Sequence, residues 1–374
     1  MTKTLPLFLL AACGSSHNTS PDATVEPDTK MVDGMEAVAP RVMIVSGDFG
    51  PGDPGVLTRI NPEAIAVITN VGPQGGVGDD PVLRRFGTEL FVVNRSDSNN
   101  ITILDANTFA LVDQLGTGAS SNPQDVAVVG DKLYVPTFGT AGVTVLTRGS
   151  GAMTIIDLSA DDPDGKPNCS SAVAVGTDVY VACELLDNTM QFLPPEGPGK
   201  VYVIDSTTDT LKHTITLANV NPFGLFEQSP ATSPLGGDLV ITTDPFQAGT
   251  TGCVERVSTG ATPAAHGCVV TNADLGGYAS RIDFQGNMMW MAVGETFPNG
   301  ALRGFDLATS TLGAAITPAA EQVVDAVGCP DGRVAVADAA TPNGVRIYNG
   351  TTEETNSALG IGLQPQSTHG LVCY

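Results

Sequence analysis

Short apolar segments of one kind recur along this chain from residue 41 onward, and each ends at a polar residue that favours a turn. In chain order they are VLTRIN (56–61), NITILD (100–105), GVTVLT (142–147), KVYVID (200–205), CVERVS (253–258), ALRGFD (301–306) and GVRIYN (344–349). AMTIID (152–157) also fits the pattern, but it completes its repeat better as the strand that follows GVTVLT. Such a repeat predicts an architecture built from one supersecondary unit.

A second strand precedes each of these segments. The copies are RVMIVS (41–46), ELFVVN (89–94), KLYVPT (132–137), DVYVAC (178–183), DLVITT (238–243), MMWMAV (288–293) and RVAVAD (333–338). Another apolar strand comes before the second one, as in PQDVAVVG (123–130), and a fourth follows the third, as in FALVDQLG (109–116). Each unit is therefore a four-stranded meander of roughly forty to fifty residues. The 43 glycines, 26 prolines and a charged fraction of only 15% agree with short strands and many turns.

Seven such units predict an all-β chain folded as a seven-bladed β-propeller of four-stranded antiparallel blades over residues 41–374. A small sheet on its own cannot cover both of its faces, whereas seven sheets arranged radially bury each face against a neighbour. A ring of six or eight blades, or a pair of β-sandwiches, is the alternative. The even coverage of the chain by the repeat disfavours the sandwiches.

The strand pattern resembles the YVTN-type repeat of bacterial surface and periplasmic propellers, in which a strand ending in Tyr-Val is followed by a Val-Ile-Asp strand. The resemblance covers residues 41–374 and is clearest in KLYV, DVYV and KVYVID. It is interrupted at CVERVS and by the long insertion at 184–200. It implies a propeller that works at the bacterial cell envelope.

The chain ends in QSTHGLVCY (366–374), an apolar stretch at a place where most chains carry polar, poorly ordered residues. The first unit begins at its second strand, RVMIVS, and lacks an inner strand. We therefore expect the C-terminal strand to pair with the N-terminal blade and to close the ring.

Four cysteines lie in pairs about predicted hairpin turns. Cys169 and Cys183 are nearly symmetric about one turn, and Cys253 and Cys268 relate in the same way about another. Cross-strand neighbours come close enough for a disulfide bond, so we expect both pairs to be bonded. A metal site is disfavoured, because the chain has no C-x-x-C pair and only four histidines.

Cys329 and Cys373 then remain, at the same place in consecutive inner strands. We expect a third disulfide between them, which would lock the ring closure covalently. Three disulfides fit an oxidising compartment.

The N-terminal segment MTKTLPLFLLAACGSS resembles a bacterial lipoprotein signal, with Lys3, a short apolar run and a cysteine directly after small residues. The resemblance implies a signal peptide over residues 1–12, lipidation at Cys13 and, with Gly14 next, sorting to the outer membrane. Residues 13–40 lack an apolar period and predict a flexible tether. We expect an exported protein of a Gram-negative bacterium, either an outer-membrane lipoprotein or a periplasmic or cell-surface protein. An ordinary signal sequence without lipidation is the alternative.

The formal net charge of −23 bears on the choice of partner. A nucleic-acid backbone is disfavoured, because phosphate binding requires clustered Lys and Arg. No stretch of the sequence is long enough for a transmembrane helix, so we expect membrane contact through the lipid anchor alone. We expect a monomer.

Polar residues fall at near-equivalent positions of the predicted inner strands, facing the central channel. They are Asp125, Ser171, Arg281, Asp325 and His369. Such a group could hold a small polar ligand or exchange protons with it. The favoured interpretation is a hydrogen-bonded polar plug in the channel. No G-x-S-x-G elbow is present to support a hydrolase.

Acidic loops raise the question of a metal. In the segment DDPDG (161–165), Asp161, Asp162 and Asp164 are candidate Ca²⁺ ligands, although the spaced ligands and terminal Glu of an EF-hand are missing. The favoured interpretation is a solvated rim with turn-forming aspartates. We therefore expect no cofactor, with Ca²⁺ as the alternative.

Together these features predict an exported, lipid-anchored propeller that serves as a binding or scaffold module and recognises a protein or glycan partner. One alternative is a periplasmic enzyme on the same scaffold, a lactonase-like hydrolase or an oxidoreductase subunit that uses polar channel residues. A structural component of a surface layer is another. The enzyme is less favoured, because the catalytic residues of such families cannot be matched onto this chain, and a fold alone does not decide function.

Overall fold

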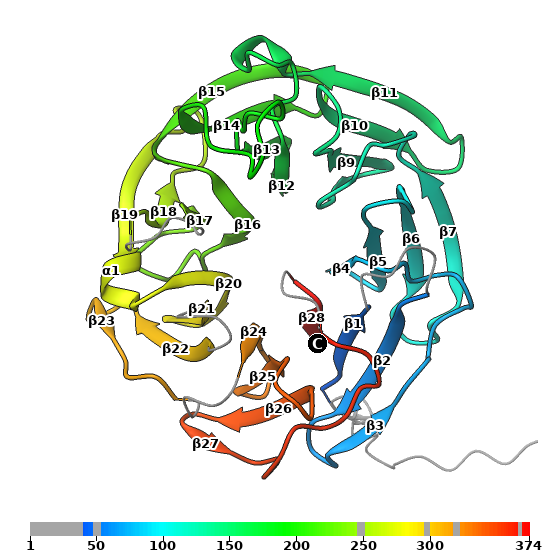
Figure 1. Cartoon of the computed structure of the whole chain (residues 1–374), viewed down its shortest axis with the longest axis vertical. Coiled ribbons are helices and arrows are strands. Elements are labelled where there is room, and N and C mark those ends of the chain that lie inside the picture. The colour runs from blue at the N-terminus through cyan, green and yellow to red at the C-terminus, as the bar shows by residue number, and fades with distance from the viewer. Residues whose placement is uncertain (1–39, 48–53, 245–250, 295–299, 317–321, 366–368) are drawn as a thin grey trace, which may run out of the picture. The chain divides into compact units, whose positions relative to one another are not determined.

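The computed structural model describes residues 40–47, 54–244, 251–294, 300–316, 322–365 and 369–374. There the chain forms seven four-stranded antiparallel sheets around a central axis, which confirms the predicted seven-bladed β-propeller (Figure 1). The predicted signal peptide (1–12), Cys13 and all of the 13–40 tether except its last residue lie outside the described residues. Within the described ranges, no helix is long and apolar enough to cross a membrane.

Each blade contains one strand of each of four classes, counted from the axis outward. In the order of blades 1 to 7, the inner strands are β28 (Leu371–Cys373), β4 (Pro81–Phe86), β8 (Ala127–Val129), β12 (Cys169–Val175), β16 (Pro222–Gln228), β20 (Tyr278–Gln285) and β24 (Val323–Gly328). The second strands are β1 (Val42–Ser46), β5 (Glu89–Asn94), β9 (Lys132–Pro136), β13 (Asp178–Cys183), β17 (Leu239–Thr243), β21 (Met288–Gly294) and β25 (Arg333–Asp338).

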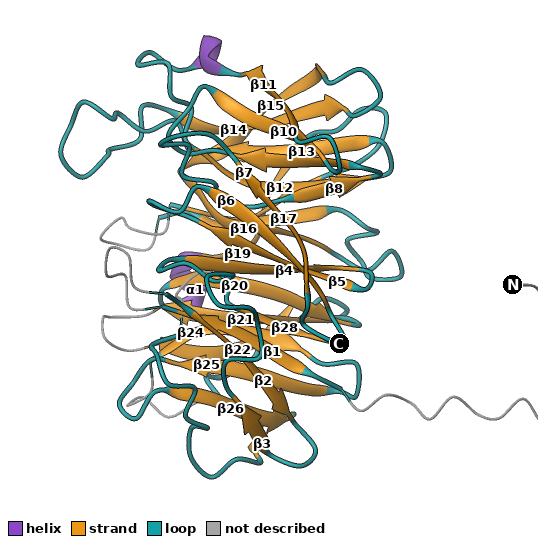
Figure 2. Cartoon of the chain, turned by 90° about the vertical axis from the view of Figure 1, so that its right-hand side faces the viewer, coloured by secondary structure: helices purple, strands orange, loops and turns teal. Residues whose placement is uncertain are grey.

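The outer half of each blade follows the same order. The third strands are β2 (Val56–Asn61), β6 (Asn100–Asp105), β10 (Gly142–Thr147), β14 (Pro198–Asp205), β18 (Cys253–Val257), β22 (Gly300–Asp306) and β26 (Gly344–Asn349). The fourth strands are β3 (Ala66–Ile68), β7 (Leu111–Gly116), β11 (Ala152–Asp157), β15 (Thr210–Val220), β19 (Ala265–Thr271), β23 (Thr311–Leu312) and β27 (Thr352–Glu353). AMTIID is the fourth strand β11, as predicted. A 3-10 turn (Ser159–Asp161) and the short helix α1 (Asn272–Leu275) lie between blades. Figure 2 shows the ring from the side, with loops at both faces.

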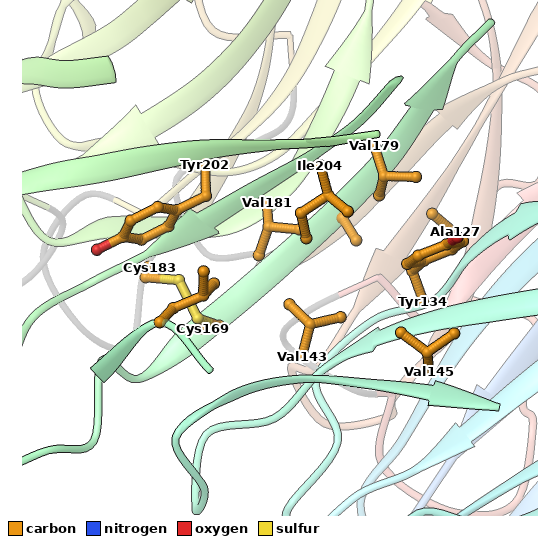
Figure 3. Close-up of a cluster of buried hydrophobic side chains, with 12 residues drawn as sticks. Ala127, Tyr134, Val143, Val145, Cys169, Val179, Val181, Cys183, Tyr202 and Ile204 are labelled. Atoms are coloured by element: carbon orange, nitrogen blue, oxygen red, sulfur yellow. A yellow bond between two sulfur atoms is a disulfide. The ribbon is translucent and has the colours of Figure 1, made fainter. Parts of the chain in front are cut away.

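Seven hydrophobic clusters form the core, one at each contact between neighbouring blades. Side chains alternate between the two faces of a strand, so one strand contributes to two clusters. In β13, Val179 and Val181 pack toward blade 3 (Figure 3), whereas Tyr180 and Ala182 pack toward blade 5. All four side chains are fully buried. A blade therefore buries its apolar faces only when both of its neighbours are present.

The predicted turn-forming residues shape the ends of the third strands. The Asp105 carboxylate accepts hydrogen bonds from the backbone N–H groups of Asn107 (2.9 Å) and Thr108 (2.7 Å). The Asp205 carboxylate accepts from the hydroxyl (2.6 Å) and the N–H (2.8 Å) of Thr207. Hydrogen bonds to the charged form, chiefly from Thr108 and Thr207, lower the pKa of both aspartates. These aspartates therefore stabilise the turns that follow the third strands.

The C-terminal strand closes the ring, as expected. Strand β28 pairs antiparallel with β1, and Val42 lies opposite Cys373. Arg41 and Tyr374 extend the ladder by two backbone hydrogen bonds of 2.6 and 3.0 Å. The hydroxyl of Tyr374 also donates to the carbonyl of Ala106 in blade 2 (2.7 Å).

The bond between Cys329 and Cys373 is present, but it does not act as expected. Cys329 follows β24, so the bond joins the closing strand β28 to blade 7. The pairing between β28 and β1 is held by hydrogen bonds. The expectation that this disulfide locks the ring is therefore corrected. The disulfide fixes β28 to blade 7, whereas β28 and β1 are held together without a covalent bond. We refer to this β28–β1 pairing as the seam.

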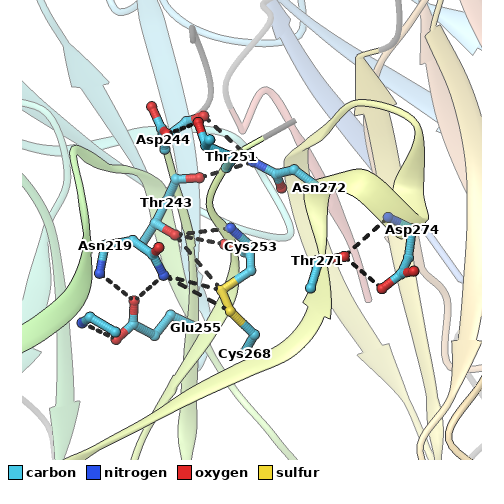
Figure 4. The surroundings of a disulfide bond; sticks show 11 residues. Asn219, Thr243, Asp244, Thr251, Cys253, Glu255, Cys268, Thr271, Asn272 and Asp274 are labelled. Atoms are coloured by element: carbon cyan, nitrogen blue, oxygen red, sulfur yellow. Dashed lines mark hydrogen bonds between the residues drawn. A yellow bond between two sulfur atoms is a disulfide. The ribbon is translucent and has the colours of Figure 1, made fainter. Parts of the chain in front are cut away.

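The other two predicted disulfides are also present, Cys169–Cys183 in blade 4 and Cys253–Cys268 in blade 5. Figure 4 shows the second of these beside the buried carboxylate of Glu255. That carboxylate accepts hydrogen bonds from the backbone N–H of Ala218 (2.6 Å) and from the amide of Asn219 (3.0 Å). The carboxylate thus ties blade 5 to the end of β15 in blade 4.

Candidate functional site

An aspartate at the inner edge of blade 3 joins that blade to the next. Asp125 is fully buried just before β8, and one of its carboxylate oxygens accepts a hydrogen bond from the N–H of Val126 (2.8 Å). The other oxygen accepts from the N–H of Ala172 in β12 (2.9 Å) and from the hydroxyl of Ser171 (3.2 Å). The oxygen of Ser171 accepts in turn from the N–H of Phe226 in blade 5 (2.7 Å). One carboxylate therefore satisfies backbone donors of two blades.

Asp325 repeats this arrangement between blades 7 and 1. It is fully buried in β24 and accepts hydrogen bonds from the N–H groups of Ala326 and of Leu371 in β28, both at 2.8 Å. Desolvation raises the pKa of Asp325, while the nearby charge of Arg281 opposes the rise. We refer to Asp125 and Asp325, each with its backbone donors, as the two aspartate clasps.

Two arginines and a glutamate connect the clasps across the axis. Arg84 of β4 makes a bidentate pair with Asp125 (2.8 and 3.0 Å), and its Nη1 donates to Glu227 of β16 (3.2 Å). Arg281 of β20 has its Nη2 3.4 Å from Glu227 and its Nε 3.7 Å from Asp325. Blades 2 and 5 lie on different sides of the ring (Figure 1). Because Arg84 of blade 2 contacts Glu227 of blade 5, we infer that these side chains reach across the channel.

His369 and Arg281 are incompletely hydrogen-bonded in this network. His369 is 1% exposed just before β28, and neither ring nitrogen has a hydrogen-bond partner among the described residues. Burial holds the pKa of His369 well below its usual value, and the charges of Arg281, Arg84 and Arg95 add to this effect. The imidazole is therefore neutral. Among the described residues, Nε and Nη1 of Arg281 also have no hydrogen-bond partner, although Nε lies 3.7 Å from Asp325.

The structure brings some of the five predicted channel residues together and leaves others apart. Asp125 and Ser171 are hydrogen-bonded, and Arg281 faces Asp325. His369 makes no side-chain hydrogen bond to described residues. The contacts of the two aspartates serve the fold, so a role of this group in ligand binding stays a prediction.

Three charged residues of the network were missed in the sequence. They are Arg84 of β4, Glu227 of β16 and Asp283 of β20. Glu227 follows the apolar run PFGLF, and that contrast is a signal that could have identified it, whereas Asp283 lies in a strand with several other polar residues. Burial raises the pKa of Asp283 to about 7, with Arg281 opposing the shift and Glu227 adding to it. Asp283 accepts a hydrogen bond from the N–H of Gly328 (2.6 Å) and so also links blades 6 and 7.

The candidate calcium ligands support a loop. Asp161 accepts a hydrogen bond from the hydroxyl of Tyr202 (3.0 Å), and Asp162 accepts one from the N–H of Asp164 (3.0 Å). Asp164 accepts from the backbone N–H (2.7 Å) and the amide (3.0 Å) of Asn188. Burial raises the pKa of Asp162 to about 6. No group of three or more His, Cys, Asp and Glu side chains in the described ranges could hold a metal ion, so the calcium hypothesis gains no support.

The loop that Asp164 supports joins β13 to β14, and we refer to residues 184–197 as the β13–β14 loop. Its base is an antiparallel bridge between Leu186 and Pro195, with a hydrogen bond from the N–H of Asp187 to the carbonyl of Pro194 (2.9 Å). The amide of Asn188 also donates to the carbonyl of Leu186 (3.0 Å). The base is thus fixed by its own backbone and by the 161–165 segment beneath it.

The tip of the β13–β14 loop presents apolar side chains to solvent. Met190 is 56% exposed and Phe192 is 89% exposed, the largest exposure among the large hydrophobic residues of the described chain. Phe192 and Leu193 have φ angles of 70° and 44°, a left-handed conformation that is unfavourable for bulky residues. The loop therefore keeps a strained backbone that holds a Phe outward instead of folding it onto the blades.

Comparisons with known proteins show the fold alone. No protein-family model matches the sequence, and no curated protein is similar to it. A putative 6-phosphogluconolactonase from Bacteroides fragilis NCTC 9343 superposes with a TM-score of 0.62 at 14% identity, over 91% of this chain and 100% of that chain. A putative 6-phosphogluconolactonase from Bacteroides uniformis ATCC 8492 gives 0.61 at 13%, over 90% and 99%. The Cps50 (Swd1) β-propeller domain of Myceliophteria thermophila gives 0.58 at 10%, over 82% and 93%. The chain is thus similar in fold to β-propellers that carry quite different descriptions.

Proposed function

We propose that this protein is an exported binding module that recognises a protein partner through the β13–β14 loop. The observation that carries the proposal is Phe192, which is 89% exposed on a loop whose base is held by hydrogen bonds. A few large side chains, aromatic ones prominent among them, supply most of the binding energy in protein interfaces. A Phe held outward on a fixed loop loses little conformational freedom when it enters a pocket.

Charges around the loop define the partner further. Asp187 and Asp164 lie near Glu196 at the loop base, and partial desolvation together with these two charges raises the pKa of the exposed Glu196 carboxyl group. With a net charge of −23, the protein is repelled by an anionic lipid surface. We therefore expect a protein whose apolar pocket is rimmed by Lys or Arg, because complementary charges favour encounter and register. An apolar tip of Met, Phe and Leu suits such a pocket better than it suits a glycan.

The enzyme alternatives have less support. Arg84, Asp125 and Glu227 pair with one another, and Asp325 is occupied by backbone donors, so none of them is poised as an acid or base. The similarity to structures described as 6-phosphogluconolactonases extends to the fold only. A structural role in a surface layer remains an alternative that the oligomeric state would reveal.

The cellular address belongs to the same proposal. Three disulfide bonds are favoured in an oxidising compartment, which supports export. We propose that the chain is anchored through a lipid on Cys13 in the outer membrane and follows the YVTN-type pattern of envelope propellers. Mass spectrometry of the mature protein tests this: a lipid-modified N-terminal Cys13 is expected, whereas an unmodified Cys13 would refute the anchor.

A matched pair of variants tests the binding site. A photo-reactive residue at position 192 should cross-link one partner in intact envelopes, and the same residue at position 153 should not. Met153 is a suitable control, because it is an exposed apolar residue on the outer strand β11. Phe192→Ser should weaken binding to that partner at least about tenfold, whereas Met153→Ser should leave it unchanged. Both variants should melt like the wild type, because neither side chain is buried.

Three results would contradict the proposal. The partner could bind Phe192→Ser as tightly as wild type, or the tip could bind anionic vesicles instead of protein. Wild type could also self-associate through the tip, which light scattering would detect. Weakening of the complex by added salt is expected if the partner's rim is basic.

A further inference from the structure

A small cavity lies at the end of the channel where the inner strands begin and the second strands end. Its volume is about 30 Å³, and its polar lining consists of Arg95, Gln124, Ser170 and Glu184, with apolar side chains of β4 and β16 on the other walls. A single water needs about 10–15 Å³ measured in this way, so the space suits two waters or a group as small as a carboxylate. The cavity does not involve the tip of the β13–β14 loop.

Arg95 supplies an excess of hydrogen-bond donors to this cavity. Its Nη2 pairs with Asp80 (2.5 Å) and its Nη1 donates to Gln124 Oε1 (3.3 Å). Its Nε has no partner in the part of the chain that the structure describes. A guanidinium has five N–H groups and no acceptor, so the unmatched donors call for an acceptor ligand.

Glu184 adds a further donor. Its side chain is buried beside Ser170, and desolvation raises the pKa of its carboxyl group to about 8, with the Ser170 hydrogen bond opposing the rise. Near pH 7 the group is therefore a neutral acid that can donate its proton in a hydrogen bond. Arg95 is the charged group that lines the cavity with it.

Three arginines act on His369, which lies beside the cavity. Gly224 lines the cavity, and a Cβ at that position would lie 3.4 Å from the His369 ring. The charges of Arg281, Arg84 and Arg95 all act on that ring and, after burial, account for its lowered pKa. Arg84 and Arg281 are both paired with Glu227, and Arg95 is paired with Asp80, so these charges are largely balanced by carboxylates. The unmatched Nε–H of Arg95 is the feature that favours an acceptor ligand.

We propose that the cavity between Arg95 and Glu184 binds the carboxylate of a small organic acid. The carboxylate accepts hydrogen bonds from the Arg95 guanidinium and the Glu184 carboxyl group. Ser170 also lines the cavity, but its hydroxyl donates to the carbonyl of Pro222 (3.1 Å). A carboxylate fits the small volume, whereas a phosphate group carries more oxygens and a larger charge than the site accommodates. This site does not rest on the protein-binding function proposed above, because Glu184 lies at the start of the β13–β14 loop and not at its tip.

Acetate and its neutral isostere acetamide test the proposal with the full chain. Acetate should raise the melting temperature in a concentration-dependent way, because a ligand that binds only the folded state stabilises it. Acetamide, chloride and inorganic phosphate should not. Arg95→Gln should weaken acetate binding at least about tenfold, whereas Arg148→Gln, which removes an arginine paired with Glu89 away from the cavity, should leave it unchanged.

A second variant keeps the test valid if Arg95→Gln fails to fold. Glu184→Gln keeps an N–H donor that does not ionise, so it should bind acetate at pH 7 like the wild type. Above pH 8 the wild type should lose acetate, because its Glu184 becomes an anion, and Glu184→Gln should keep it. Equal stabilisation by acetamide, tighter binding of phosphate, or the same pH dependence in wild type and Glu184→Gln would overturn the proposal.

Discussion

The inner strands of blades 4 and 1 occupy the same place in the ring but are held in different ways. Strand β12 runs through a tight turn into β13 and is bonded to it by Cys169–Cys183. Strand β28 meets β1 through backbone hydrogen bonds, because the two strands come from opposite ends of the propeller. An aspartate clasp holds each of these inner strands. Asp125 accepts a hydrogen bond from Ala172 of β12, and Asp325 accepts one from Leu371 of β28.

This difference shows where the ring depends on few contacts. Loss of one interaction in blade 4 leaves the covalent hairpin in place. Strands β28 and β1 are paired over only three residues, Val42 to Ile44, with backbone hydrogen bonds at Arg41 and Val45 on either side. The chain strengthens this seam at Tyr374, whose hydroxyl bonds to Ala106 and whose ring lies 4.3 Å from the Arg85 guanidinium. Both partners belong to blade 2, so the terminal residue is tied beyond the blade that it completes.

Deletion of residues 369–374 should have the largest effect. It removes the inner strand of blade 1, the disulfide partner of Cys329 and a buried side chain, Leu371, from the cluster between blades 7 and 1. We expect the cooperative melt to disappear and proteolysis to reach the inner blades. Circular dichroism and limited proteolysis would check this, and a melt within a few degrees of wild type would show that the seam is redundant.

Removal of either of two disulfides, the one at β28 or the one in blade 4, should have the next largest effect, and the two losses of stability should differ. The Cys329–Cys373 bond closes a separation of 44 residues and the Cys169–Cys183 bond one of 14. Loop-closure entropy predicts losses of about 4 and about 3 kcal/mol when each pair is replaced by serines. Urea unfolding of the two double variants measures both values. A larger loss for the blade 4 pair would contradict our view that the closing strand is the weaker one.

The two clasps should respond differently to neutralisation. Asp125→Asn leaves Arg84 without its bidentate charge partner and should cost about 3 kcal/mol. Asp325→Asn should cost about 1 kcal/mol, because Arg281 lies 3.7 Å away and burial already disfavours the charged form of Asp325. Denaturant midpoints at one pH compare the two. Equal losses would mean that the arginine geometry does not matter.

The last expected effect is gradual, a pH dependence of stability to which Glu184 of blade 4 contributes. Glu184 follows β13, whereas the residue after β1 is Gly47, which does not titrate. Because burial raises the folded-state pKa of Glu184 from 4.5 to about 8, the folded state binds the proton more tightly and stability should fall as pH rises between these values. The slope is at most about 1.4 kcal/mol per pH unit. Melting curves of Glu184→Gln should lack this component, and parallel pH profiles would refute it.

Much of the fold could be predicted because the repeat is a local pattern. Strand segments such as KVYVID can be recognised from their own residues. The symmetric placement of Cys169 and Cys183 about a turn predicts the disulfide bond between them. The effect of Cys329–Cys373 could not be predicted in the same way. It depends on which neighbour holds β28 covalently and which by hydrogen bonds, and only the assembled ring shows this.

The site was less predictable, because its contacts are remote in sequence. Arg84 and Glu227 are 143 residues apart, and no local pattern links them. The candidate residue Asp125 was found from its strand position, but its backbone partner Ala172 lies in another blade. The β13–β14 loop was visible only as an interruption of the repeat, and the positive φ of Phe192 follows from the loop's own closure.

The sharing of each strand between two clusters has a consequence for how the chain is made. During synthesis β1 emerges early, and its partner β28 emerges near the end. Until then every intermediate is an open arc with an uncovered apolar face at each end, a species prone to aggregation. Maturation is therefore a single late event, and a delay before β28 arrives would prolong the time during which chaperones must cover both ends.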